Sequence, residues 1–75
     1  MRHITERQAQ VLIFIENFIQ ENNYSPTIRE IAKHFNMSAK GAFDHIFALQ
    51  KKGAIHCVYG KARTITLAKK QGIEA

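Results

Sequence analysis

The stretch Thr27–Gly53 limits the fold of this 75-residue chain most, because it places two helical patterns around a turn of only three residues. The apolar positions of the first pattern are spaced as on one face of a short helix: Ile28, Ile31, Ala32 and Phe35. The second pattern repeats four and then three residues apart, at Ala42, Ile46 and Leu49. A short helix, a tight turn and a second helix predict a helix-turn-helix unit.

Local capping signals support both helices. Thr27 and Glu30 form a capping box, in which each side chain bonds to the other residue's backbone N–H. In the turn, Asn36 tolerates a positive φ and Ser38 is a good N-cap for the next helix. Gly53 is the expected C-cap.

The segment before this unit predicts a longer, supporting helix. Thr5 and Gln8 form a second capping box, and the run ends near Asn23, a residue that tolerates the left-handed conformation. Ile13 and Phe14 widen the apolar stripe, so we expect this helix to contact neighbours on two sides. The stripe itself has helical spacing: Val11, Leu12, Ile15, Phe18 and Ile19.

After Gly53 the apolar period changes from helical to two. Alternating positions predict two short strands, with a tip at residues 59–62: Ile55 and Cys57, then Ile65 and Leu67. The expected fold class is therefore mostly α with a small β-hairpin, a winged helix-turn-helix of three helices and a two-stranded antiparallel wing. We expect one domain over residues 1–68, with 69–75 as a frayed end or the start of a linker.

Positive charge is confined to the helix-turn-helix unit and the residues after it. Residues 1–26 carry two arginines against three glutamates, a net charge of −1, whereas residues 27–70 carry nine cations against two acids, a net charge of +7. Segregation of this kind favours a polyanionic partner. A basic face that merely keeps the protein soluble is the alternative.

Other classes of function find little support. One cysteine and four histidines match no usual zinc spacing, so we expect no metal and no cofactor. No apolar run spans a membrane and no signal peptide is apparent, so we expect a cytoplasmic protein. We also expect no enzyme activity, because Ser25 and Ser38 have capping or turn roles and no acid pair or activated nucleophile is present.

The side chains at the start of the third helix suit a double-stranded DNA partner. Lys40 can donate to guanine, Asp44 can accept from cytosine, and Phe43 can contact a thymine methyl group. Ser38 lies where a helix N-terminus suits a phosphate, and a close approach of DNA would explain Gly41. We expect six residues to contact the DNA backbone: Thr27, Arg29, Ala39, Lys52, Lys61 and Arg63.

Structural roles remain open for several of these residues. Phe43 can instead close the core over the first helix, and Asp44 can pair with a lysine in solvent. Lys61 and Arg63, on a turn expected to pack against nothing, have the weakest structural explanation. A winged-helix module for protein contacts is the competing function, and it predicts an apolar outer face on the third helix.

Residues 4–53 resemble the DNA-binding domain of the LexA repressor family, and the wing extends this resemblance to about residue 67. Three motifs carry it, namely ITERQ, then SPTIREI, then HIFALQKKG. The resemblance implies a bacterial, nucleoid-associated repressor of DNA-damage (SOS) genes that binds palindromic operators as a dimer. It also implies that Ser38, Lys40, Gly41, Phe43 and Asp44 read bases. Another bacterial winged-helix regulator remains an alternative.

The resemblance has limits at the reading positions. The turn before Ser38 is one residue shorter than usual, and the segment AKGAFD replaces the family's polar sets, so we expect a different operator. Members of the family carry a second domain for dimerisation and for self-cleavage by a Ser/Lys dyad upon RecA activation. None of this falls within the 75 residues, so we expect either an excised domain or a truncated natural chain, and the aperiodic end favours an excised domain.

Overall fold

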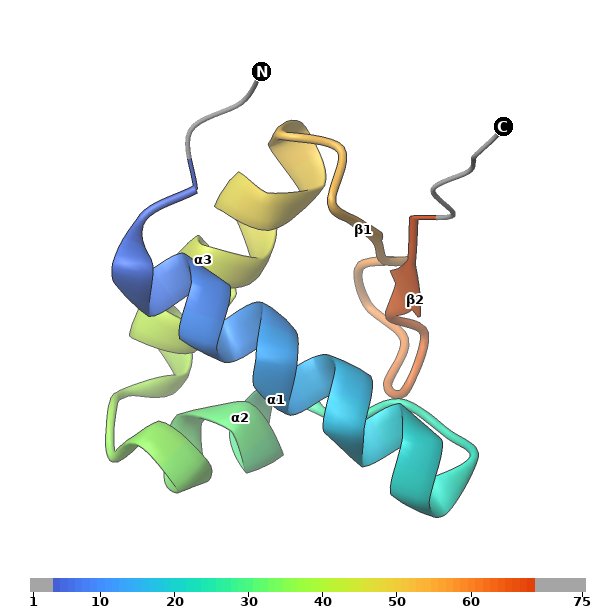
Figure 1. The fold of residues 1–75 in the computed structure, drawn as a ribbon. Helices are drawn as coiled ribbons and strands as arrows, with labels where there is room; N and C mark the ends of the chain where they lie inside the picture. Colours follow the sequence, from blue (N-terminus) through green and yellow to red (C-terminus); the bar gives the residue numbers. More distant parts are fainter. Residues whose placement is uncertain (1–3, 69–75) are drawn as a thin grey trace.

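A computed structural model describes residues 4–68 as three helices followed by a two-stranded antiparallel hairpin. The elements in chain order are α1 (Glu6–Asn22), α2 (Ile28–Phe35), α3 (Ala39–Lys51), β1 (Ile55–His56) and β2 (Thr66–Leu67). Figure 1 shows α1 crossing the molecule, with the hairpin on the opposite side of the view from the turn between α2 and α3. The helix α1 packs against both α2 and α3, and α3 also contacts β1. This is the expected winged helix-turn-helix.

The predicted caps begin all three helices. Thr5 Oγ1 accepts from the Gln8 N–H at 3.1 Å, and Thr27 Oγ1 accepts from the Glu30 N–H at 3.1 Å. Both capping boxes are complete, because the side chains of Gln8 and Glu30 accept from the capping backbone N–H groups in return. Ser38 Oγ caps α3 by accepting from the Gly41 N–H at 3.0 Å. Each helix start therefore follows from residues three positions apart.

Asparagines end the first two helices as predicted. Asn23 has φ 65° and Asn36 has φ 55°, the left-handed conformation that asparagine tolerates. At α3 the assignment shifts by one residue, because Lys52 is the C-cap and Gly53, with φ 82°, follows it. A glycine just after the C-cap has the positive φ that reverses the chain, so the prediction of Gly53 as the C-cap was wrong by one position.

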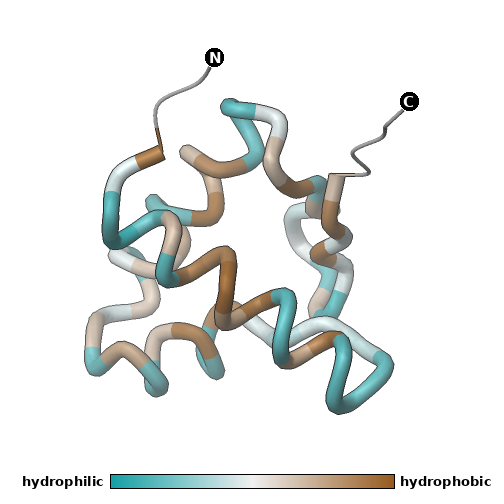
Figure 2. Tube along the Cα trace, in the orientation of Figure 1, coloured by the Kyte–Doolittle hydropathy of each residue, from teal (hydrophilic) through white to brown (hydrophobic). Residues whose placement is uncertain are grey.

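The core lies where the three helices and the hairpin meet. Its buried members come from every part of the fold: Val11, Ile15, Ile31, Ala32, Ala42, Ile46, Leu49, Ile55, Cys57 and Ile65. Figure 2 shows hydrophobic residues concentrated in the middle of α1. Phe14 packs on Phe35 of α2, with ring centroids 5.7 Å apart. The helix α1 contacts neighbours on two sides as predicted, but Ile13 is 54% exposed and does not widen the buried stripe. It lies two residues from both Val11 and Ile15, which turns it to the far side of the helix.

The hairpin is paired over only two residues per strand, with Ile55 opposite Leu67 and His56 opposite Thr66. The expected alternation largely holds, because Cys57 and Ile65 are buried beyond the paired residues. There the Thr64 hydroxyl takes the place of backbone hydrogen bonds between the strands. It accepts from the Val58 N–H at 3.0 Å and donates to the Val58 carbonyl oxygen at 3.0 Å. The wing therefore consists of a short paired segment and a loop that the Thr64 side chain holds together.

Two predictions about the ends of the domain stay untested. The interpretation of residues 69–75 as a frayed end or linker lies outside the described residues, and the domain limit at residue 68 stays a prediction. Within the described residues, no helix has the length and apolar character needed to cross a membrane.

Candidate nucleic-acid interface

The first two turns of α3 present most of the predicted base-reading side chains to solvent. Ser38, Lys40, Phe43 and Asp44 are exposed, and Gly41 is half-buried. The opposite face of the same helix is the fully buried stripe formed by Ala42, Ile46 and Leu49. The core therefore holds α3 along one side only and leaves the other side of its N-terminal half free for contact with a partner.

Gly41 has a local structural reason in addition to any contact with DNA. Its N–H donates to the capping Ser38 Oγ at 3.0 Å. A Cβ atom at position 41 would lie 3.3 Å from that same oxygen, tighter than an ordinary contact. The absence of a side chain therefore leaves room for the cap.

Lys40 and Asp44 form an ion pair one helical turn apart. Lys40 Nζ lies 3.4 Å from Asp44 Oδ2, and the two side chains are 84% and 61% exposed. This is the solvent pairing that the sequence left open for Asp44. An exposed pair of this kind stabilises a helix only slightly, by about 0.3–0.5 kcal/mol, so both groups can leave it for a base edge at little cost.

Phe43 is not part of the core. It is 37% exposed, and its ring lies 5.3 Å from that of Tyr59 in the hairpin and 6.3 Å from that of Phe47. Phe47 and Tyr59 are themselves 48% and 41% exposed. Burial also raises the pKa of the Tyr59 phenol, which stays protonated at neutral pH. The alternative that Phe43 closes the core over α1 was wrong, because its ring is part exposed and lies beside Tyr59 of the hairpin.

The predicted backbone-contacting residues at the start of α2 and on the wing surround one groove. Its volume is about 370 Å³, and Thr27, Arg29, Lys61 and Arg63 are among its lining residues. Arg29 and Lys61 are exposed, and neither forms an ion pair with another described residue. Ala39 is exposed at the start of α3. The groove therefore carries two cations that are available to an anionic partner.

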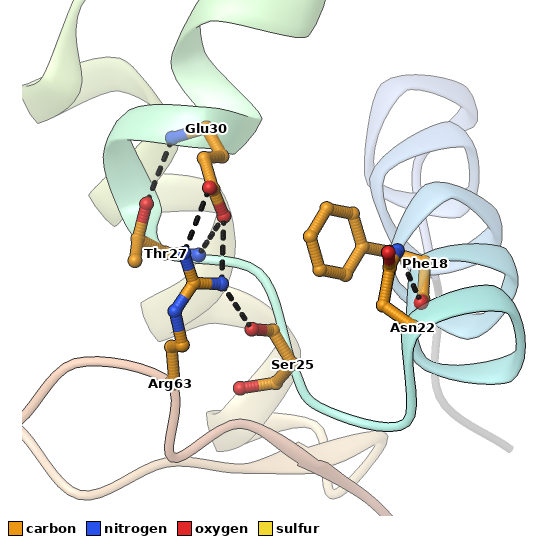
Figure 3. A network of polar contacts seen from close by, with 6 residues as sticks. All are labelled: Phe18, Asn22, Ser25, Thr27, Glu30 and Arg63. Atoms are coloured by element: carbon orange, nitrogen blue, oxygen red, sulfur yellow. Dashed lines mark hydrogen bonds and ion pairs between the residues drawn. The ribbon is translucent and has the colours of Figure 1, made fainter.

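The Arg63 side chain is directed toward Glu30 and Ser25, as Figure 3 shows. Its Nη1 and Nη2 donate to the two carboxylate oxygens of Glu30 at 3.1 and 2.9 Å, and Nη1 also donates to the Ser25 carbonyl oxygen at 3.0 Å. The guanidinium carbon lies 4.7 Å from the centre of the Tyr24 ring. The expectation that this turn packs against nothing was therefore wrong for Arg63. A phosphate contact by Arg63 stays a prediction, and it would compete with Glu30.

We call the contacts of Arg63 with Glu30, Ser25 and Tyr24 the latch. Its electrostatics favour the charged forms of both Arg63 and Glu30. The hydrogen bond from Arg63, with a smaller effect of the Thr27 backbone N–H, lowers the pKa of Glu30 below its usual value. The same hydrogen bond raises the pKa of Arg63. Arg63 also adopts φ 58°, a left-handed conformation that a side chain rarely favours. The contacts of its guanidinium offset the cost of this conformation.

Lys52 is a second predicted backbone contact that has an internal partner. Its Nζ donates to Gln8 Oε1 at 2.6 Å, which joins the end of α3 to the start of α1. Gln8 Oε1 also accepts from the Thr5 N–H, so one side chain serves a cap and a tertiary contact. The phosphate contact of Lys52 stays a prediction.

Three features of the site were not predicted from sequence: the Arg63–Glu30 pair, the Lys52–Gln8 bond and the place of Tyr59 beside Phe43. The partners of the first two are 33 and 44 residues apart in the chain. The sequence held no direct signal for these contacts, because Gln8 and Glu30 already had capping roles. Both amide and carboxylate groups accept more than one hydrogen bond, which leaves capacity for a second partner.

Comparison with known proteins gives one consistent family. A family model described as the LexA DNA binding domain matches residues 1–64. The chain is 51% identical over 71 residues to the LexA repressor of Thermosipho melanesiensis, covering 95% of this chain and 36% of that protein. For the LexA repressor of Thermotoga maritima these values are 48% over 69 residues, 92% and 35%. For that of Leptospira interrogans they are 40% over 75 residues, 100% and 37%.

The chain thus spans about a third of the length of the curated relatives it matches. The matched third carries the helix-turn-helix and the hairpin, and the family model covers all three helices and most of the wing. On this match, and on the three-helix and hairpin architecture, the chain belongs to the LexA DNA-binding domain family.

Proposed function

We propose that this chain binds double-stranded DNA in a sequence-specific way, with α3 in the major groove of one operator half-site, as part of a LexA-like transcriptional repressor. The observation that carries the proposal is the one-sided packing of α3. Ala42, Ile46 and Leu49 are fully buried, while the predicted reading positions Lys40, Phe43 and Asp44 project from the other side. A helix held in this way beside a basic wing suits a major groove.

The proposed base contacts follow from the chemistry of each side chain. Lys40 donates to guanine O6 and N7, and Asp44 accepts from the cytosine amino group, after their weak mutual ion pair opens. Because the two side chains lie one turn apart, they read neighbouring base pairs. Ser38 and Gly41 lie at the helix N-terminus, where DNA can approach the backbone closely.

The proposed backbone contacts divide into two kinds. Thr27, Arg29, Ala39 and Lys61 are placed at helix starts or on the exposed loop, where they can reach phosphates without losing an internal ion pair. The remaining two, Lys52 and Arg63, must share or exchange their internal partners. We therefore expect Lys61 and Arg29 to supply more of the electrostatic affinity.

Selection from a pool of random duplexes tests the proposal. The expected result is an enriched half-site motif and an affinity that falls steeply with salt. When the logarithm of the binding constant is plotted against the logarithm of the salt concentration, the slope should be about −0.9 for each phosphate neutralised. A pool from which no motif is enriched would show that α3 does not read bases.

A pair of variants separates reading from general affinity. Lys40→Ala and Asp44→Ala should each relax the preferred base at one position, with a discrimination loss of about 1–3 kcal/mol. The matched control is Arg29→Ala, an exposed cation outside α3, which should weaken all sequences alike. Unchanged preference in both α3 variants would contradict the assigned contacts.

The relatives are named LexA repressors, and from them we extend the proposal to the whole protein. It represses SOS genes in the bacterial cytoplasm, in association with the nucleoid. It dimerises on palindromic operators through a second domain and is inactivated by RecA-stimulated self-cleavage at a Ser/Lys dyad. The reading frame after Ala75 tests this extension, because an Ala-Gly cleavage site followed by a domain with Ser and Lys would support it and a stop codon would contradict it.

A protein-interaction module is the second candidate, and the exposed rings of Phe43, Phe47 and Tyr59 favour it. The cations on the same helix, Lys40 and Lys51, are against it, because a site for an uncharged partner has no use for them. Binding to DNA that stayed constant between low and high salt would support this candidate.

A further inference from the structure

Three aromatic rings form one exposed cluster between α3 and the wing. Phe43 and Phe47 lie one turn apart on α3, and Tyr59 lies at the start of the hairpin loop. The ring centroids are 5.3–6.5 Å apart, within the range of favourable aromatic contacts. The cluster therefore joins the reading helix to the wing and holds Phe43 from two sides.

Cations lie next to this cluster on α3 and follow it in the sequence of the loop. Lys40 precedes Phe43 by three residues, Lys51 Nζ lies 5.9 Å from the centre of the Phe47 ring, and Lys61 follows Tyr59 by two residues. The acid nearest in sequence, Asp44, is already paired with Lys40. An apolar patch with cations beside it on the same helix matches a partner surface that carries both anionic and apolar groups.

A DNA major groove has these properties at thymine. Phosphates line its edges, and the C5-methyl group of thymine is the apolar group that a base pair displays on its floor. Large exposed apolar side chains that form a continuous patch usually mark a binding surface. Phe43 lies in the second turn of α3, between the proposed polar readers Lys40 and Asp44 and the wing.

We propose that Phe43, positioned by Phe47 and Tyr59, packs against a thymine methyl group, so that the half-site requires thymine at one defined position. This inference rests on the proposed function. Phe47 and Tyr59 act as positioning residues that limit the motion of the Phe43 ring, and they contribute to specificity through that ring.

Replacing thymine by deoxyuridine tests the inference, because this change removes the methyl group and leaves the Watson–Crick edge unchanged. Using the 75-residue chain and its selected half-site, each thymine is replaced in turn and the dissociation constant is measured. We expect one position at which binding weakens about fourfold, the effect of one lost apolar carbon contact. Thymines outside the half-site serve as the control and should show no change.

The variants form a cycle with the same two duplexes. The quantity compared is the ratio of the dissociation constants for the deoxyuridine and thymine duplexes, expected to be about four in the wild type. Phe43→Ala should bind both duplexes equally, while Phe47→Ala and Tyr59→Ala should reduce this ratio in part. Lys40→Ala should weaken both duplexes and keep the ratio. Ile13→Ala, at another exposed apolar residue on α1, should change neither value. Circular dichroism verifies that each variant is folded, and the wild-type measurement stands without any variant.

Specific binding with no position sensitive to deoxyuridine would overturn the inference and leave the proposed function intact. So would a ratio that persists in Phe43→Ala. A pool that yields no enriched motif would overturn both. Self-association of the free chain that Phe47→Ala abolishes, with the thymine ratio absent, would identify a second copy as the occupant of the cluster and overturn the inference.

Discussion

Lys61 and Arg63 are two cations of the same wing, and the fold uses them in opposite ways. Lys61 is exposed on the turn that its N–H closes with the Val58 carbonyl oxygen at 3.3 Å. Arg63, two residues later, folds back onto Glu30, Ser25 and Tyr24. One cation extends into solvent, and the other fixes the loop that carries it.

This difference separates a charge that is free to bind a partner from a charge that positions the loop. The planar guanidinium of Arg63 serves a carboxylate, a carbonyl oxygen and an aromatic face together, which the compact ammonium group of a lysine cannot do. The latch sets the wing against the start of α2, and the position of Lys61 depends on it. The net charge of the segment alone does not reveal this division.

The largest expected effect concerns Ser25, the buried anchor of the latch. Its Oγ accepts from the Ile65 N–H at 3.2 Å, and its carbonyl oxygen accepts from Arg63. Ser25→Ala leaves the Ile65 N–H buried without a partner, and we expect a loss of about 1–3 kcal/mol in the free energy of unfolding, measured by urea denaturation. Ser38→Ala, which removes an exposed cap, is the control, and a loss in Ser25→Ala no larger than in this control would contradict the anchor role.

Arg63→Ala should come next and should separate the two wing cations. We expect a lower Tm and weaker binding of all duplexes, because the wing loses its fixed position against α2. Arg63→Lys should restore the charge without restoring the Tm, since an ammonium group cannot replace the bidentate contact. Thermal unfolding measures the Tm, and a Tm equal to that of the wild type in Arg63→Ala would show that the latch has no structural role.

Lys61→Ala should leave the Tm unchanged and weaken binding to every duplex to a similar extent. The loss of one phosphate contact should reduce the salt slope by about 1. Fluorescence anisotropy at several salt concentrations measures this change. If Lys61→Ala instead altered the preferred motif, this residue would be a base reader and the contrast with Arg63 would need another explanation.

The smallest effect is a pH dependence of stability from Glu30. Arg63 lowers the Glu30 pKa in the folded state from its usual value of 4.5. The stabilisation is therefore present above about pH 4.5 and is lost as the pH falls through the lower, folded pKa. Glu30→Gln should be less stable than the wild type at pH 7, and the difference should shrink toward pH 3. Parallel stability curves for the two proteins would contradict an ionised Glu30 as the partner of Arg63.

The sequence by itself determined the elements and the starts of the three helices, and it placed the helix ends to within one residue. The caps at Thr5, Thr27 and Ser38 and the left-handed residues Asn23 and Asn36 depend on groups at most four residues apart, so local physics decides them. Apolar periodicity likewise predicted the buried stripe of α3 and the hairpin. These patterns, together with the family motifs, were sufficient for the fold class.

Only the tertiary structure decided which polar and aromatic side chains are free to bind. Sequence patterns assign Arg63 and Lys61 the same role, and leave Phe43 both a core and a surface role, because charge and hydrophobicity are properties of a residue alone. Whether Arg63 meets Glu30, or Phe43 meets Tyr59, depends on how the wing packs beside α2 and α3. That packing is set by the whole buried core, and no local pattern contains it.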